Sequence, residues 1–220
     1  MAISLADVLT MFQKEADPER AEQMAAYMRN RFAFFGINKP ERKALTAQLL
    51  KDSRKISVSA LLELVQQLYS QPQRECHYLA IDLLERNHRR LTYEVFQLLY
   101  PLIDQNAWWD SVDALRKPMS LWVKEHREYL DEVMDLLLSA PSFWQRRVAI
   151  TLQLQWKEDT DTHWLARAIL ENREDQEFFI QKAIGWALRD YSKTNPEWVR
   201  AFLQQHELSR LAVREGSKYV

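Results

Sequence analysis

Glycine is scarce in this chain. Only Gly36, Gly185 and Gly216 occur among its 220 residues. Tight hairpin turns need backbone positions with positive φ, which glycine adopts at least cost, so three glycines allow few such turns. No stretch alternates apolar and polar residues as a half-buried strand does. Leu, Ala, Gln, Glu and Arg, which favour helices, are abundant. The composition therefore predicts an all-α protein.

The chain also has little cysteine, no basic leader and no long hydrophobic run. Cys76 is its single cysteine, which excludes an intramolecular disulfide framework and is typical of a reducing compartment. The first ten residues, MAISLADVLT, contain Asp7 and no basic segment, unlike a signal peptide. Charged residues interrupt every candidate membrane span. We therefore expect a cytoplasmic protein without membrane contact.

An excess of charge of one sign is absent as well. Lys and Arg number 30 against 31 Asp and Glu, so the net charge is −1. A neutral balance argues mildly against a nucleic-acid binder unless the cations gather on one face. A Gly-rich phosphate loop is missing, and the histidines show no metal-ligand spacing. The sequence predicts neither a metal nor a nucleotide cofactor.

Helices are expected along the whole chain, with short connections that are often marked by proline. The spacing of apolar residues, caps and prolines predicts helices over 5–14, 18–31, from Pro40 onward, 57–70, 72–87, 92–104, 108–117, 118–126, 127–140, 142–157, 161–172, 175–193 and 196–206. Asp113 and Arg147 are 34 residues apart, and Arg147 and Lys182 are 35 apart. Such periods are typical of stacked helical repeats that line a concave surface. We expect one α-solenoid domain over 1–220.

The segment WWDSVD, residues 108–113, combines two tryptophans and two carboxylates. In a helix, Trp108, Val112 and Leu115 form an apolar stripe, whereas Trp109 and Asp113 share another face. Packing explains the first tryptophan but not the second. The pattern therefore indicates a candidate site at Trp109 and Asp113.

Two later helices carry cations beside apolar residues. Arg147 lies in an apolar segment, where a guanidinium needs an anionic partner. Asp110 or Asp113 of the preceding repeat could supply it, either as a purely structural salt bridge or as part of a site. In 175–193, Lys182, Trp186, Arg189 and Lys193 line one face, opposite a core face that is already occupied. Trp186 is either a packing residue or an aromatic that contacts a phosphate-bearing ligand.

Near the N-terminus, Tyr27 lies on the polar face of its helix, either at the rim of a core or at a ligand. The sequence GINKPER follows, in which Pro40 is expected to open a helix. Its N-terminus, near Asn38 and Lys39, is predicted to be open to an anion.

These motifs resemble the AlkD-like DNA alkylation repair glycosylases, which are built from HEAT-like repeats. The resemblance runs along essentially the whole chain, through GINKPER, NAWWDSVD, FWQRRVAI and FFIQKAIGWALRDYSKTNP. It implies that Asp113 is the catalytic carboxylate, that Trp109 and Trp186 line the cleft, and that Arg147 is the family's arginine. Arg189 and Lys193 match contacts to the DNA backbone, and Tyr27 and Pro40 match contacts beside the damaged base pair. Lys182, Asn38 and Lys39 are expected to bind DNA with them. Lys39 and Gln155 depart from the pattern, which puts a minor-groove contact and the affinity in question.

The resemblance further implies hydrolysis of the N-glycosidic bond of N3- and N7-alkylated purines in duplex DNA, without base flipping, metal or cofactor. We expect a monomer that is associated with the nucleoid when bound to DNA. A HEAT-like scaffold that binds DNA or protein without catalysis is the alternative. A nuclease is a weaker rival, because it would ordinarily need clustered metal-binding carboxylates, and only Asp110 and Asp113 are close.

Overall fold

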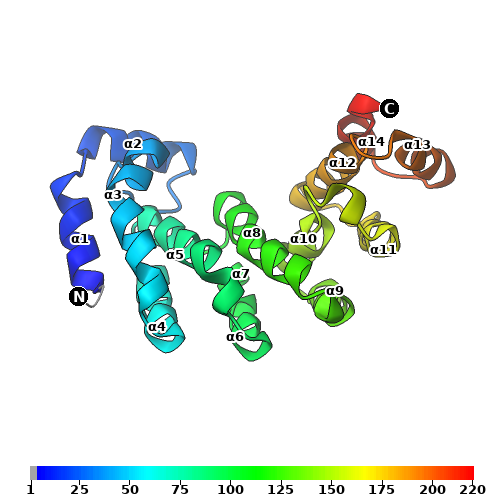
Figure 1. Ribbon diagram of the computed structural model, residues 1–220. Coiled ribbons are helices and arrows are strands. Elements are labelled where there is room, and N and C mark those ends of the chain that lie inside the picture. Colours follow the sequence, from blue (N-terminus) through cyan, green and yellow to red (C-terminus); the bar gives the residue numbers. More distant parts are fainter. Residues whose placement is uncertain (1–3) are drawn as a thin grey trace. The chain divides into compact units, whose positions relative to one another are not determined.

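The computed structural model describes residues 4–220, which are helical with short connections (Figure 1). In this part of the chain the extended backbone is limited to an isolated bridge between Ala33 and Gln73, and no strand is present. The prediction of an all-α fold is confirmed. The chain forms two compact units, Met1–Phe96 and Gln97–Val220. The prediction that 1–220 is a single domain stays a prediction.

Over residues 4–96, the first unit contains five complete α-helices and two short 3-10 turns. They are α1 (Leu5–Lys14), α2 (Pro18–Tyr27), α3 (Lys39–Asp52), α4 (Val58–Tyr69) and α5 (Arg74–Asn87), with turns at Ser53–Lys55 and His88–Arg90. Helices α4 and α5 pack closely, and α3 lies against α5. Side-chain caps begin several of these helices: Ser4, Asp17, Asn38 and Ser57 each accept a hydrogen bond from a first-turn amide.

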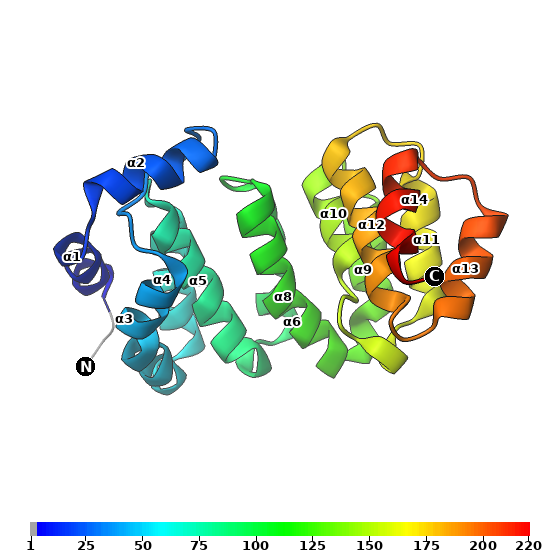
Figure 2. The ribbon, with the colours of Figure 1, turned by 90° about the horizontal axis from the view of Figure 1, so that it is seen from above.

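The second unit continues the helical array after α6 (Tyr93–Gln97), which crosses the boundary. Its helices are α7 (Tyr100–Asp104), α8 (Trp109–Glu125), α9 (Leu130–Leu138), α10 (Phe143–Thr151), α11 (Thr162–Asn172), α12 (Phe178–Tyr191), α13 (Pro196–Gln205) and α14 (Arg210–Gly216), with 3-10 turns at Arg127–Tyr129, Lys157–Asp159 and Ser217–Tyr219. Helix α10 packs against both α8 and α12. Figure 2 shows α14 alongside α12, and these two make extensive contact.

The helical repeat predicted from the sequence is present in the second unit. Helices α8, α10 and α12 begin at residues 109, 143 and 178, which are intervals of 34 and 35 residues. Their apolar faces are buried, including Val112, Val148 and Ile184. Each repeat buries its apolar face against its neighbours, which is how stacked repeats are stabilised.

Several predicted helix boundaries are wrong. Helix α8 runs through Pro118 instead of dividing there. The expected helix 92–104 is divided into α6 and α7, and α10 ends at Thr151 instead of 157. Thr151 donates its hydroxyl to the Arg147 carbonyl at 2.8 Å, and Gln155 then has a φ of 67°, which an α-helix does not accommodate.

Two further helices differ from the prediction. Helix α2 ends at Tyr27 instead of 31, because Arg29 and Asn30 have φ values of 56° and 54°. Helix α14 and the turn after it were not expected from the sequence. Within residues 4–220 no helix is both long and apolar enough to cross a membrane.

Candidate functional site

Asp113 and Arg147 form a bidentate ion pair between α8 and α10. Arg147 donates through Nε to Asp113 Oδ1 and through Nη2 to Oδ2, each at 2.8 Å. The arginine side chain is 5% exposed and the carboxylate 19% exposed. The hypothesis that Arg147 is held by a carboxylate of the WWDSVD segment is confirmed, and that carboxylate is Asp113. A planar guanidinium bound in this way fixes both the position and the orientation of the carboxylate.

A backbone carbonyl completes the environment of Arg147. Its Nη1 group donates to the carbonyl oxygen of Phe179, in the first turn of α12. The guanidinium therefore connects α8, α10 and α12, and its nearly buried charge is satisfied by one carboxylate and one carbonyl.

An aromatic cluster holds the same three helices together at their N-terminal ends. The Phe179 ring lies 5.2 Å from Trp108 and 4.9 Å from Trp144, and the two indoles are 6.1 Å apart between centroids. Both tryptophans are buried. This packing fixes the main chain at Phe179, and so the carbonyl that Arg147 uses. Sequence reasoning missed this role, although the aromatic residues at 108, 144 and 179 recur at nearly the same period as helices α8, α10 and α12.

Trp109 and Trp186 are both partly exposed. Trp109 opens α8 and precedes Asp113 by four residues, so the two share a helix face. Trp186 lies on α12, four residues after Lys182. The expectation that Trp108 packs in the core is confirmed, since it is 8% exposed, whereas Trp109 is only partly buried.

Helix α12 ends at Tyr191 instead of 193, so Lys193 lies in the turn after it and not on the helix face with Lys182 and Arg189. All three cations contact a C-terminal segment that the sequence reading did not include. Lys182 and Arg189 pair with Glu215 of α14 at 3.3 and 3.1 Å. Lys193 lies over the ring of Tyr219, with its Nζ 5.4 Å from the centroid. The sequence suggested that these cations lie on an open helix face, but each of them contacts a residue of the C-terminal segment.

Glu215 is the common anion of this cluster. It also accepts a hydrogen bond from Lys218 at 3.0 Å. The hydrogen bonds from Lys218 and Lys182 lower the pKa of Glu215 to about 2, so the carboxylate is ionised at neutral pH. Three cations thus share one carboxylate.

In the first unit, Tyr27 ends α2 with a side chain that is 72% exposed.

Helix α3 begins at Lys39, so Pro40 is its second residue instead of its first. The prediction that this helix N-terminus is open to an anion is wrong. Asn38 accepts from the Glu41 amide at 3.1 Å, Glu41 accepts from the Asn38 amide at 3.3 Å, and Pro40 has no N–H to offer.

The loop that precedes α3 is fixed by a buried carboxylate. Glu75 on α5 is fully buried and accepts hydrogen bonds from the amides of Phe35, Gly36 and Ile37 at 3.0, 2.9 and 3.1 Å. Gly36 has a φ of 89°, and a side chain there would collide with the Asp17 carbonyl. Asn38, Lys39 and Pro40 therefore follow a turn that Glu75 holds in place, a partner that the sequence alone did not indicate.

The two departures from the family pattern lie on well-defined backbone. Lys39 is exposed at the first position of α3. The backbone N–H of Gln155 donates to Asp190 Oδ2 at 2.6 Å, which connects the turn after α10 to α12.

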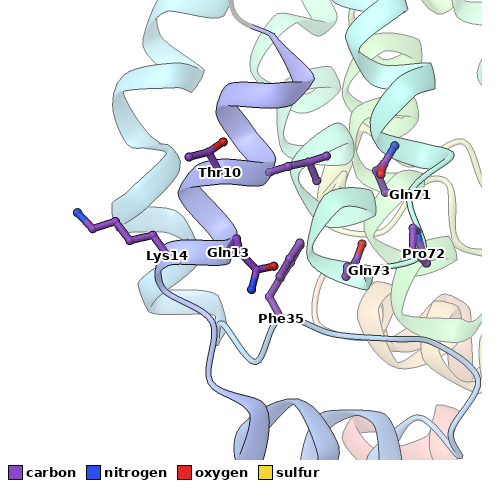
Figure 3. Close-up of a pocket in the computed structure, with 8 residues that line it drawn as sticks. Thr10, Gln13, Lys14, Phe35, Gln71, Pro72 and Gln73 are labelled. Carbon is purple, nitrogen blue, oxygen red and sulfur yellow. The ribbon is translucent and has the colours of Figure 1, made fainter.

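A cavity of about 650 Å³ lies in the first unit between α1 and the segment before α5 (Figure 3). Gln13, Phe35 and Gln73 are among its lining residues, and Lys14 is its one ionisable group. It contains none of the predicted site residues and no acid–base pair. Among residues 4–220, no group of three or more His, Cys, Asp or Glu side chains is placed to hold a metal ion. The absence of a metal stays a prediction.

Comparison with known proteins supplies the family. The profile of the family described as "DNA alkylation repair enzyme" matches residues 8–220. The solved structure of a predicted DNA alkylation repair enzyme from Enterococcus faecalis is 47% identical, covers 93% of this chain and 96% of its own, and has a TM-score of 0.91. AlkD2 from Streptococcus mutans is 20% identical, with 91% and 99% coverage and a TM-score of 0.69, and so shares the fold. No curated protein matches.

Proposed function

Because the chain belongs to the DNA alkylation repair enzyme family, we propose that it is a DNA glycosylase that removes N3- and N7-alkylated purines, such as 3-methyladenine and 7-methylguanine, from duplex DNA. The observation that carries the proposal is the geometry of Asp113. Its carboxylate is held at both oxygens by Arg147 yet remains about one-fifth exposed. A fixed, accessible anion on a largely apolar framework suits the stabilisation of a cation that develops during a reaction.

The reaction needs little besides that anion and a water molecule. Alkylation of a ring nitrogen makes the purine a cation and therefore a good leaving group. As the bond between C1′ and the base nitrogen breaks, its electron pair goes to the base, which leaves neutral, and positive charge develops on the deoxyribose. Asp113 stabilises this oxocarbenium-like charge and orients the water, whose oxygen bonds to C1′ and whose proton is released to solvent.

The other proposed site residues assist by position and by charge. The faces of Trp109 and Trp186 add cation-π attraction to the charged sugar. Lys182, Arg189 and Lys193 contact the phosphate backbone. In the first unit, Tyr27, Asn38, Lys39 and Pro40 contact the duplex; Asn38 does so while its side-chain oxygen caps α3.

A non-catalytic DNA-binding scaffold is the second candidate. It is favoured by the fact that Arg147 occupies both oxygens of Asp113, as a structural ion pair would. Against it, a purely structural ion pair does not require its carboxylate to remain 19% exposed, as that of Asp113 does.

Single-turnover release of 7-methylguanine from methylated duplex DNA, with a chelator present, tests the proposal. Wild-type protein should excise the base, and Asp113→Asn should lose about 10²–10³ in rate, or roughly 2.7–4 kcal/mol. Asp110→Asn is the matched control, because it removes the same charge from the same helix. Absence of excision by the wild type would favour the scaffold, and full activity of Asp113→Asn would remove the assigned role of this carboxylate.

A further inference from the structure

The C-terminal segment packs against α12 at unusually close range. A Cβ atom on Gly185 would lie 2.5 Å from the Glu215 Cβ, and one on Gly216 would lie 3.0 Å from the Leu188 Cβ. The contacts proceed in register from Gly185 with Ala212 and Glu215, through Leu188 with Gly216, to Lys193 with Tyr219. The segment therefore runs in the same direction as α12, beside it, as Figure 2 shows.

This packing brings a fourth cation to the side of α12 that carries the proposed phosphate contacts. Lys218 pairs with Glu215 at 3.0 Å, and Glu215 also pairs with Lys182 and Arg189. The Glu215 side chain is only 12% exposed, whereas Lys182, Arg189 and Lys218 are 39%, 29% and 46% exposed. The carboxylate is thus at the base of the cluster, and the cations reach solvent around it.

The charges in this cluster do not balance. Three cations surround one carboxylate, which leaves two positive charges in excess. Arg189 uses one of its N–H groups on Glu215 and Lys182 and Lys218 one each, so most of their donors remain for another acceptor. A purely structural bridge needs one cation for each carboxylate, and gathering two more costs self-repulsion. An external polyanion would compensate that excess.

We propose that Lys218 is a DNA-backbone contact, and that with Lys182 and Arg189 it forms a phosphate-binding site in which Glu215 holds the three cations together. This rests on the proposed function only in so far as the substrate is DNA. Duplex DNA fits better than a single small anion, because Lys193, in the turn that follows α12, lies over Tyr219 beside Lys218 and adds a further positive charge to the cluster.

The test compares two charge-equivalent variants of the full-length protein. Lys218→Gln removes a cation that pairs with a glutamate three residues earlier. Arg200→Gln on α13 removes a cation paired in the same way with Glu197. Affinity for an undamaged duplex is measured by fluorescence anisotropy over a range of salt concentrations. Lys218→Gln should reduce the magnitude of the slope of log affinity against log salt by about 0.9, so that a variant that matches the wild type at 1 M salt binds roughly eightfold more weakly than the wild type at 0.1 M.

Arg200→Gln should leave the slope unchanged, and Lys218→Arg should restore it because the charge is retained. A wild-type slope for Lys218→Gln, or an equal drop for Arg200→Gln, would overturn the proposal.

The two proposals fail in different ways. If the wild type binds DNA but releases no base, the glycosylase assignment fails while the slope still decides the role of Lys218. If the wild type excises 7-methylguanine and Lys218→Gln keeps the full slope, only the phosphate site is lost.

Discussion

Replacing Arg147 by methionine should destabilise the second unit and inactivate the site together. Methionine preserves much of the length of the side chain but removes all three hydrogen bonds, two to Asp113 and one to the Phe179 carbonyl. Removing one partner of a buried ion pair costs about 3–5 kcal/mol. Because 19% of the Asp113 side chain reaches solvent, water hydrates its orphaned charge in part, and we expect the lower end, about 3 kcal/mol.

Urea unfolding monitored by tryptophan fluorescence measures this loss selectively. All eight tryptophans lie between residues 108 and 198, so their emission reports on the second unit alone. The midpoint should fall without a change in slope, since the surface exposed on unfolding stays the same. Excision should fall as well, measured in conditions where the variant is folded, because Asp113 is no longer held in one orientation.

The double variant Arg147→Met, Asp113→Asn separates charge pairing from chemistry. It leaves no unpaired charge, so it should be more stable than the sum of the two single changes predicts, by about 1 kcal/mol or more. Its excision rate should nevertheless stay about 10²–10³ below the wild type. Unchanged stability and turnover in Arg147→Met would refute the role of the pair, and recovery of excision in the double variant would refute the need for the Asp113 charge.

Replacing Arg189 and Lys193 together by glutamine should lower the salt slope of duplex binding by about 0.9–1.8, and an unchanged slope would place the DNA elsewhere. Glu215→Gln should remove a contribution to folding stability that the wild type itself loses at low pH. The pKa of Glu215 is about 2 in the folded protein, below its ordinary 4.5, so its stabilisation is present above pH 4.5 and is lost as the pH falls towards 2. The difference in Tm between wild type and variant should therefore shrink over that range, and a constant difference would contradict this. Glu75→Gln should speed amide exchange at Gly36 by about 10- to 150-fold, because a charge-assisted hydrogen bond is worth about 1.5–3 kcal/mol; exchange at the wild-type rate would show that the loop is held otherwise.

Local sequence pattern predicted much of the fold and the central pair of the candidate site. The 34- and 35-residue spacing of Asp113, Arg147 and Lys182 matches the starts of α8, α10 and α12. In a stacked repeat, equivalent positions on successive helices lie side by side. A nearly buried guanidinium in one repeat therefore takes its carboxylate from the repeat before it, and this is why the partner of Arg147 could be anticipated.

Boundaries and long-range partners were decided by tertiary structure. Pro118 has no N–H and so removes one backbone hydrogen bond from α8, which costs about 3 kcal/mol. Local sequence preference therefore predicts that the helix ends at this proline. Burial of the flanking Leu115, Met119 and Trp122 outweighs that loss, and the helix continues.

Within each unit, the groups that hold the proposed contact residues belong to elements distant in sequence from them. The amides of the Gly36 turn meet Glu75, some 40 residues further along the chain. Arg189 meets Glu215 on a short helix with no strong sequence signal of its own. The sequence by itself determined which residue types face out of each helix, because helical periodicity is local. Tertiary structure alone decided which of them meet, because that depends on how closely two helices approach, as Gly185 and Gly216 allow for α12 and α14.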